Sequence, residues 1–185
     1  ALRDIETRAK PGDIVFLASL RMPELRGRDW ESGEDAGFAE AASELTPEQI
    51  QGARSSAEAV LSRLEADGLH ILIDAPKPVL KVQPYRCSDW FNRMNPVCDP
   101  GLTVERTRLE QLRAPQMTLL QTLKREYPDL HVWDPFPILC PNAICTAFDE
   151  SKPLYLDDNH LSGHGNHVLT PSFLKTVLEI WRSPT

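Results

Sequence analysis

The sequence lacks two features that would assign it to a familiar class: a long apolar run and an excess of basic residues. No segment approaches the roughly 18 consecutive apolar residues of a membrane-spanning helix, so we predict no transmembrane helix within it. The net charge of -7 argues against a nucleic-acid partner, because phosphate backbones are bound by clustered lysine and arginine. We also expect no signal peptide. The opening ALRDIETRAKPGD is typical of the end of a helix already under way, which suggests a processed chain or a fragment of something longer.

The sequence has only four cysteines, which form two pairs of residues close in sequence, Cys87 with Cys98 and Cys140 with Cys145. Neither pair has the close spacing that is usual for a zinc site. Four free buried thiols are one alternative. Each pair brackets loop-like sequence, CSDWFNRMNPVC and CPNAIC, so we favour two disulfides that each close a small loop. Such disulfides would place the protein in the periplasm or outside the cell.

Three short apolar runs, at residues 13–19, 70–76 and 130–136, predict buried strands. Helical patterns follow each of them, and this alternation indicates an α/β domain with a parallel sheet covered on both faces. In such sheets, binding and catalytic residues lie at the carboxyl ends of the strands. The polar residues at these ends are Ser19, Asp74 and Asp134. Asp157 stands at such an end as well if residues 154–156 are extended.

The clearest helix is predicted after Thr46, a good N-cap that is followed by Pro47 and by Gln49 at the capping-box position. Gly68 is the expected stop. A later helix should be kinked or split at Pro115. The remaining predictions are helices at 103–126 and from about 171 to 181, and loops at 21–44 and 77–102.

The segment LYLDDNHLSGHGNHVLTP, residues 154–171, holds three of the five histidines. A metal site there would draw on His160, His164 and His167 with Asp157 or Asp158. The helical two-histidine zinc motif, however, needs glutamate directly after its first histidine, and leucine stands there. Metal binding is therefore the weakest of three interpretations.

The other two interpretations are a triad and a capping loop. Asp157 and His160 are three residues apart, so a turn can set the carboxylate beside the imidazole, where it fixes the tautomer and stabilises the imidazolium. Alternatively, Ser162 caps a helical turn and the polar side chains are simply solvated. Spacing alone weighs these two about equally.

The same residues resemble a known family. LYLDDNHLSGHGN is similar to the last block of the SGNH (Ser-Gly-Asn-His) hydrolase superfamily, where Asp-x-x-His supplies two triad members. Leu-Tyr-x-Asp-x-x-His-Leu-Ser-x-x-Gly looks most like SGNH domains fused behind acyltransferase-3-type membrane proteins. Those bacterial enzymes O-acylate, usually O-acetylate, envelope polysaccharides, lipopolysaccharide or peptidoglycan. CPNAIC and LEADGLHILIDAP fit the same subgroup, and the resemblance runs from about residue 12 to the end.

This resemblance implies a flavodoxin-like three-layer sandwich and a function. His160 would act as general base toward a serine, and Asp157 would orient it. The partners would be an acyl donor, a glycan acceptor and an integral-membrane acyltransferase domain in the same polypeptide. No cofactor and no nucleic acid are implied. The domain would face the periplasm or the exterior, with the full-length protein in the bacterial inner membrane.

The family's Gly-Asp-Ser block, which carries the nucleophile on the first strand, is absent from the sequence. We expect that serine upstream, outside this chain, which would leave a single SGNH-like domain at residues 1–185 without its first strand. Alternatively, that segment has been cleaved, the domain has lost its activity, or Ser19 has been recruited. Ser19 and Arg21 are candidate oxyanion or substrate contacts. The competing functions are a non-catalytic envelope carbohydrate-binding module of the same fold and a zinc-binding protein.

Overall fold

The computed structural model describes residues 2–18, 46–89, 91–92, 95–96, 98, 102–157 and 160–182. The predicted loop at 21–44 lies outside these residues. Within them the elements are α1 (Leu2–Arg8), β1 (Ile14–Leu17), α4 (Pro47–Ala66), β2 (His70–Asp74), α5 (Pro84–Cys87), β3 (Thr103–Glu105), α6 (Arg106–Glu126), β4 (Leu130–Trp133), α7 (Phe136–Leu139), β5 (Ile144–Thr146), β6 (Phe148–Asp149), β7 (Lys152–Pro153) and α8 (Gly163–Arg182).

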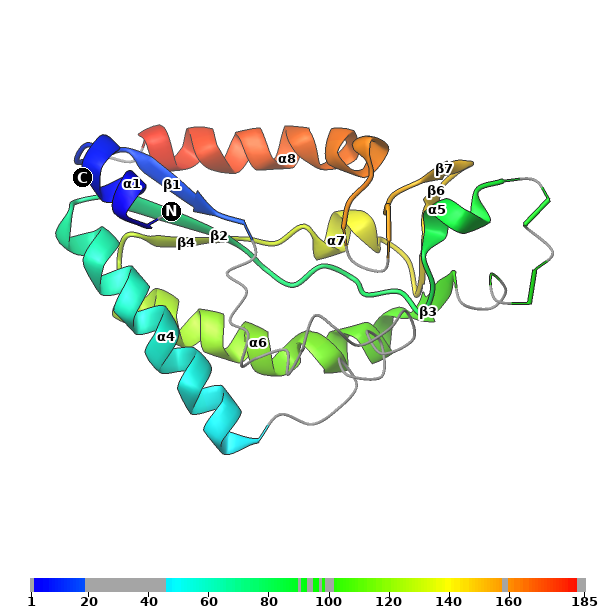
Figure 1. Cartoon of the computed structure of the whole chain (residues 1–185), viewed down its shortest axis with the longest axis horizontal. Coiled ribbons are helices and arrows are strands. Elements are labelled where there is room, and N and C mark those ends of the chain that lie inside the picture. The colour runs from blue at the N-terminus through cyan, green and yellow to red at the C-terminus, as the bar shows by residue number, and fades with distance from the viewer. Residues whose placement is uncertain are drawn as a thin grey trace.

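A parallel sheet in the order β1-β2-β4 forms the centre of the described structure (Figure 1). All five residues of the central strand β2 are buried, as expected for a strand that is covered on both faces. The predicted α/β class and the three predicted strands are thus confirmed. Each strand is shorter than the apolar run that predicted it. Strand β2 ends at Asp74, and β4 ends at Trp133 before α7 begins at Phe136.

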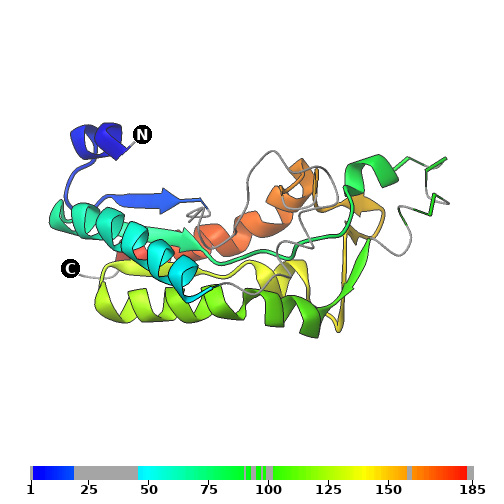
Figure 2. The same ribbon diagram turned by 60° about the horizontal axis from the view of Figure 1, so that its bottom comes forward.

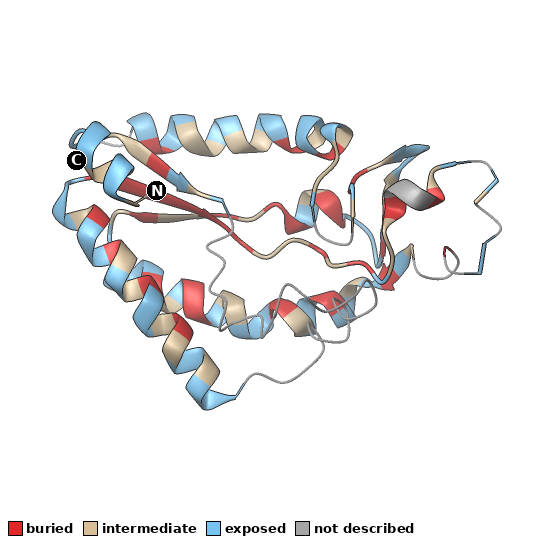
Figure 3. Cartoon of the chain, in the orientation of Figure 1, coloured by how far each residue is buried: buried red, intermediate tan, exposed pale blue. Residues whose placement is uncertain are grey.

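Alternate side chains of the sheet pack into two separate cores. Ile71 shares one core with Leu61 of α4 and Leu123 of α6. Leu72, the next residue along β2, packs instead in the core that contains Leu169 of α8. Figures 1 and 2 show α4 and α6 on one side of the sheet and α8 on the other, and Figure 3 shows that the buried residues lie along the strands and on the inward faces of the helices. The arrangement is therefore a three-layer α/β sandwich.

The N-terminus of α4 has the predicted capping box. The Gln49 N–H donates to the Thr46 hydroxyl at 3.2 Å, and the Thr46 N–H donates to the Gln49 side chain at 2.8 Å. After α4 the chain turns through Gly68, whose φ of +69° is readily adopted by glycine. Both ends of this helix were therefore predictable from local sequence.

Two helix predictions were wrong in their bounds. Residues 103–105 form β3 rather than the start of a helix, and α6 then continues through Pro115 without being split. The last helix begins at Gly163, not near Pro171, which lies inside it. Both prolines are exposed, so water can bind the carbonyl groups that lose their helical N–H partners.

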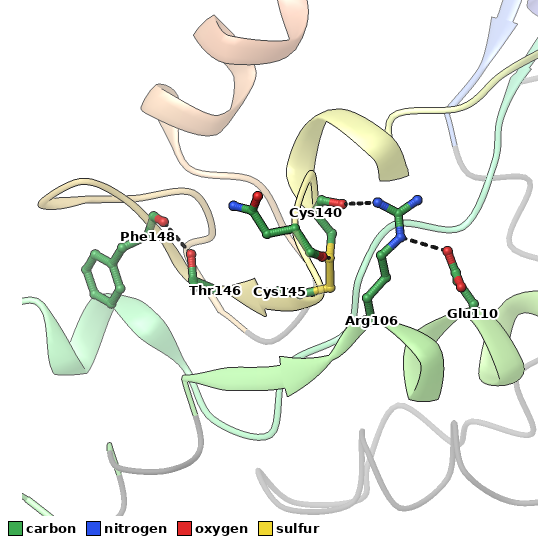
Figure 4. The surroundings of a disulfide bond; sticks show 7 residues. Arg106, Glu110, Cys140, Cys145, Thr146 and Phe148 are labelled. Carbon is green, nitrogen blue, oxygen red and sulfur yellow. Dashed lines mark hydrogen bonds and ion pairs between the residues drawn. A yellow bond between two sulfur atoms is a disulfide. The ribbon is translucent and has the colours of Figure 1, made fainter.

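Both predicted disulfides, Cys87–Cys98 and Cys140–Cys145, are present. The second closes the loop between α7 and β5, and Cys145 pairs with Val104 across the β3–β5 ribbon. Figure 4 shows how this loop is held to the start of α6. The guanidinium of Arg106 donates to the Cys140 carbonyl at 2.9 Å and to Glu110 at 2.7 Å. A covalent bond and a charged hydrogen bond thus fix the ribbon beside the sheet.

His131, near the amino end of β4, predicts how the stability of the protein depends on pH. Burial, with His70 and Lys124 nearby, lowers the pKa of His131 below the ordinary histidine value, although Asp129 opposes this shift. The unfolded chain therefore binds a proton more readily than the folded one, so stability should fall as the pH drops below about 6.5. Urea unfolding between pH 8 and pH 5 measures this loss. His131→Gln should reduce it, whereas His167→Gln, at an exposed position, should not; equal profiles for wild type and His131→Gln would contradict the assignment.

Candidate active site

Acidic side chains stand at the carboxyl ends of two strands, as the sequence predicted, but both are held by cations. Asp74, at the end of β2, is buried and lies 2.7 Å from the ammonium group of Lys77. Asp134 follows β4, accepts from the Phe136 N–H at 3.0 Å, and lies 2.8 Å from the guanidinium of Arg113. These contacts fix the chain where it leaves the sheet, and they explain both carboxylates without a catalytic role.

The segment between β7 and α8 forms a tight turn beyond the carboxyl ends of the strands (Figure 1). Tyr155 and Leu161 form an antiparallel bridge across it. The Leu156 N–H donates to the His160 carbonyl at 2.7 Å, and the Ser162 N–H donates to the Leu154 carbonyl at 3.0 Å. Backbone hydrogen bonds on both arms thus close the turn that contains Asp157 and His160.

Within this turn, the carboxylate of Asp157 contacts His160 through both oxygens. One oxygen accepts from the His160 backbone N–H at 2.6 Å, and the other lies 2.7 Å from ring atom Nδ1. An ionised carboxylate can only accept, so in the neutral imidazole this contact favours the tautomer with the proton on Nδ1 and the lone pair on Nε2. The His160 side chain is 45% exposed, which leaves the imidazole accessible to a reacting group. This is the geometry that an orienting acid and a general base require.

The turn is fastened to the first turn of α8 by Ser162 and Gly165. The Ser162 hydroxyl donates to the Pro153 carbonyl at 2.5 Å and accepts from the Gly165 N–H at 3.0 Å, as an N-cap does. A Cβ atom on Gly165 would lie only 2.1 Å from the Leu154 carbonyl oxygen, so no larger residue fits there. Capping by Ser162, considered above as an alternative to the triad, is thus present together with the Asp–His pair.

The other histidines of the segment are placed elsewhere. His164 Nε2 lies 2.8 Å from a carboxylate oxygen of Asp149 in β6, and His167 is exposed on α8. Among the described residues, no group of three His, Cys, Asp or Glu side chains could hold a metal ion. The three histidines therefore do not converge on one point.

Three predicted candidates cannot be placed, since Ser19, Arg21 and Asp158 lie outside the described residues. Conversely, sequence reasoning missed two charged partners, Arg113 and Asp149. Arg113 is buried on α6 with its guanidinium 4.3 Å from the Phe136 ring centre. Its position among the leucines of the helix was a usable signal, whereas nothing in the sequence links Asp149 to His164.

A three-layer α/β sandwich with an Asp–His pair beyond the carboxyl ends of its strands has the arrangement of an SGNH hydrolase-type domain. The chain belongs to the family described as the SGNH domain fused to AT3 domains, whose model matches residues 1–175. A comparison with curated proteins found no match. The family supports an enzyme of hydrolase or acyltransferase type, placed outside the cytoplasm and joined to a membrane acyltransferase domain. In the part of the chain that the structure describes, no helix is long and apolar enough to cross a bilayer.

The contact at Gly165 gives a matched pair of variants. Gly165→Ala should lower the free energy of unfolding by about 1–3 kcal/mol, because its Cβ atom must push α8 away from Leu154. Gly163→Ala, two residues earlier, meets nothing within 4 Å and should change stability by less than about 0.5 kcal/mol. Urea unfolding of both variants measures the difference. Equal stability of the two would show that the close approach does not constrain the turn.

Proposed function

We propose that this domain is an O-acyltransferase or acetyl esterase that acts on bacterial envelope polysaccharide through a serine, histidine and aspartate. The observation that carries the proposal is the 2.7 Å contact between Asp157 and His160, in a turn that both α8 and the backbone hold in place. The family supplies the reaction type. The acceptor class comes from the resemblance of the motif around these two residues.

In the proposed reaction, His160 Nε2 takes the proton of a serine hydroxyl as the serine oxygen bonds to the acyl carbonyl carbon. The Asp157 carboxylate stabilises the imidazolium that forms. His160 then returns the proton to the leaving group of the donor, and an acyl-enzyme remains. A sugar hydroxyl next attacks this ester while His160 accepts its proton, and the serine hydroxyl is regenerated. Water in place of the sugar gives the esterase reaction.

The serine in this proposal lies outside the 185 residues, on a strand that pairs with the outer edge of β1. Among the described residues, β1 pairs with β2 on one of its edges and stands at the edge of the sheet. All four of its residues are apolar. Phe16 of this strand is 40% exposed and packs edge-on against Phe173 of α8, with ring centres 4.8 Å apart. An unpaired apolar strand edge is a ready site for another strand.

The apolar surface of α8 also extends beyond the sheet beneath it. Leu174, Leu178 and Trp181 are all at least 47% exposed. Each directly follows a residue that packs in the core, so the exposed stripe flanks the buried one. A helix that covers only three strands needs a narrower apolar face than this. A further strand beside β1 would use the additional width, and its carboxyl end would lie at the same end of the sheet as His160.

The placement outside the cytoplasm that the family supports agrees with the two disulfides, which persist in oxidising compartments. We propose that the domain works on the periplasmic or outer face of the bacterial inner membrane. The joined membrane domain would deliver the acyl group there. An envelope polysaccharide such as lipopolysaccharide would receive it.

The dyad predicts the effect of three substitutions on acyl transfer by the full-length protein. His160→Ala should lower kcat/KM by about 10⁴-fold or more, and Asp157→Asn by about 10³–10⁴-fold, because the base or its tautomer is lost. His167→Ala, in an exposed position on the neighbouring turn of α8, should stay within about twofold of wild type. Release or transfer of acetyl from a small acetyl ester measures all three. If His160→Ala is folded by circular dichroism and retains full activity, His160 is not the general base.

The proposed strand beside β1 predicts that Leu178→Gln lowers stability by different amounts in proteins with and without that strand. In the 185-residue chain Leu178 is 47% exposed, so Leu178→Gln should change stability by less than about 0.5 kcal/mol. In a polypeptide that includes the upstream strand, the same residue would be covered, and the change should cost about 1–3 kcal/mol. Lys175→Gln, at a position with a 77% exposed side chain, is the control in both forms. Equal tolerance of Leu178→Gln in both would argue against a strand beside β1.

A further inference from the structure

A separate hollow of about 350 Å³ lies between the β3–β5 ribbon, the start of α6 and the loop after β2. This volume is at the lower end of the range of about 300–1,000 Å³ for small-molecule sites. The described residues that line it are Lys81, Thr103, Val104, Glu105, Arg108 and Ile144. None of these residues belongs to the Asp–His turn, yet β3 and β5 lie beyond the same ends of the sheet strands as that turn (Figure 1).

The wall of the hollow is rigid on the side of the ribbon. Cys145, in the same strand as Ile144, is bonded to Cys140, and Arg106 holds the Cys140 carbonyl from the start of α6 (Figure 4). The backbone of Arg106 adds a second tie, since its N–H donates to the Ala143 carbonyl at 2.9 Å. The hollow is therefore preformed on this side rather than dependent on a ligand for its shape.

Two of the residues that line the hollow are cations, Lys81 and Arg108, although the chain as a whole carries -7. The first turn of α6, all of which the structure describes, has no acidic residue and contains Arg106 and Arg108. Two cations at a helix N-terminus are unfavourable by themselves, because the helix dipole is already positive there. Arg106 is neutralised by Glu110, but Arg108 forms no ion pair with any described residue. Arg108, with Lys81 also in the lining, would therefore stabilise an anionic group here.

The remaining lining groups fit the rest of a sugar. Glu105 faces the same hollow, makes no side-chain capping bond, and can accept hydrogen bonds from hydroxyl groups. Ile144 is 46% exposed and offers an apolar surface to the C–H face of a pyranose ring. A carboxylate would repel a bare anion, whereas it binds a polyol that carries an anion at one end. The mixture thus favours a saccharide with one acidic substituent.

We propose that this hollow binds an acidic sugar unit, one with a phosphate or carboxylate group, of the acceptor glycan. Arg108 and Lys81 hold the acid, Glu105 accepts from ring hydroxyls, and Ile144 supports the ring. The description of the ligand as part of an acceptor rests on the proposed function, but binding of the sugar does not. The site would hold a polymeric acceptor at a point separate from the hydroxyl that is acylated.

Binding to the intact protein is measured by saturation-transfer difference NMR and calorimetry without any acyl donor. The probes are glucose 6-phosphate, glucuronic acid, methyl glucoside and inorganic phosphate. Both acidic sugars should bind about tenfold or more tightly than methyl glucoside, the size of one charge-assisted hydrogen bond. A preference for only one of them identifies phosphate or carboxylate as the natural acid. Equal binding of methyl glucoside would overturn the proposal, and so would inorganic phosphate binding as tightly as glucose 6-phosphate.

Three variants connect the binding to the hollow. Arg108→Gln should weaken both acidic sugars by about tenfold, whereas Arg125→Gln, an exposed arginine at the far end of the same helix, should leave them unchanged. Glu105→Gln should weaken the sugars and not weaken inorganic phosphate, because a negative charge is removed. If Arg108→Gln and Arg125→Gln behave alike, the hollow is not the site.

The same proteins separate this inference from the proposed function. His160→Ala should retain binding of the acidic sugars while losing acyl transfer. If acyl transfer occurs but sugar binding does not depend on Arg108, the proposed sugar site is wrong and the proposed enzyme function stands. If sugar binding depends on Arg108 but the full-length protein transfers no acyl group to any ester or glycan, the proposed sugar site stands and the proposed enzyme function is wrong.

Discussion

The arrangement of the candidate site depends on the closeness of α8 to the backbone of Leu154. Only a residue without a side chain fits at Gly165, and the Ser162 hydroxyl completes the contact by bonding both sides of the junction. Because α8 is anchored there, its other end can cover one whole face of the sheet. The turn that holds Asp157 and His160 lies between these two fixed segments, so the two side chains share one rigid support.

The features that sequence predicted well are those set by neighbouring residues. The capping box at Thr46 and Gln49 needs only three positions, and the stop at Gly68 needs only one. Strand β2 was predictable because a sheet covered on both faces demands an unbroken apolar run. The Asp157–His160 contact belongs to the same group, since its spacing alone permits a closed turn. The two disulfides likewise join cysteines that are near in sequence.

The features that sequence missed depend on partners that are distant in the chain. Gly163 and Pro171 both disfavour a helix locally, yet α8 includes them because Ser162 caps it and its inner face is buried against the sheet. Strand β3 has only one buried residue and forms because β5 pairs with it. Arg113 is buried in α6 because Asp134, from the end of β4, neutralises it. None of these pairings is visible within a local window of sequence.

Asp157 and His160 come from one turn, and this has a consequence for how the proposed active site would be assembled. Bringing Asp157 and His160 together closes a loop of only a few residues, so the loss of chain entropy is small and the pair forms without help from distant segments. The proposed nucleophile, in contrast, would come from a different part of the polypeptide. In the proposed enzyme the Asp157–His160 pair would be in place before the serine arrives, and activity would then depend on one docking step, the pairing of one further strand with the edge of β1.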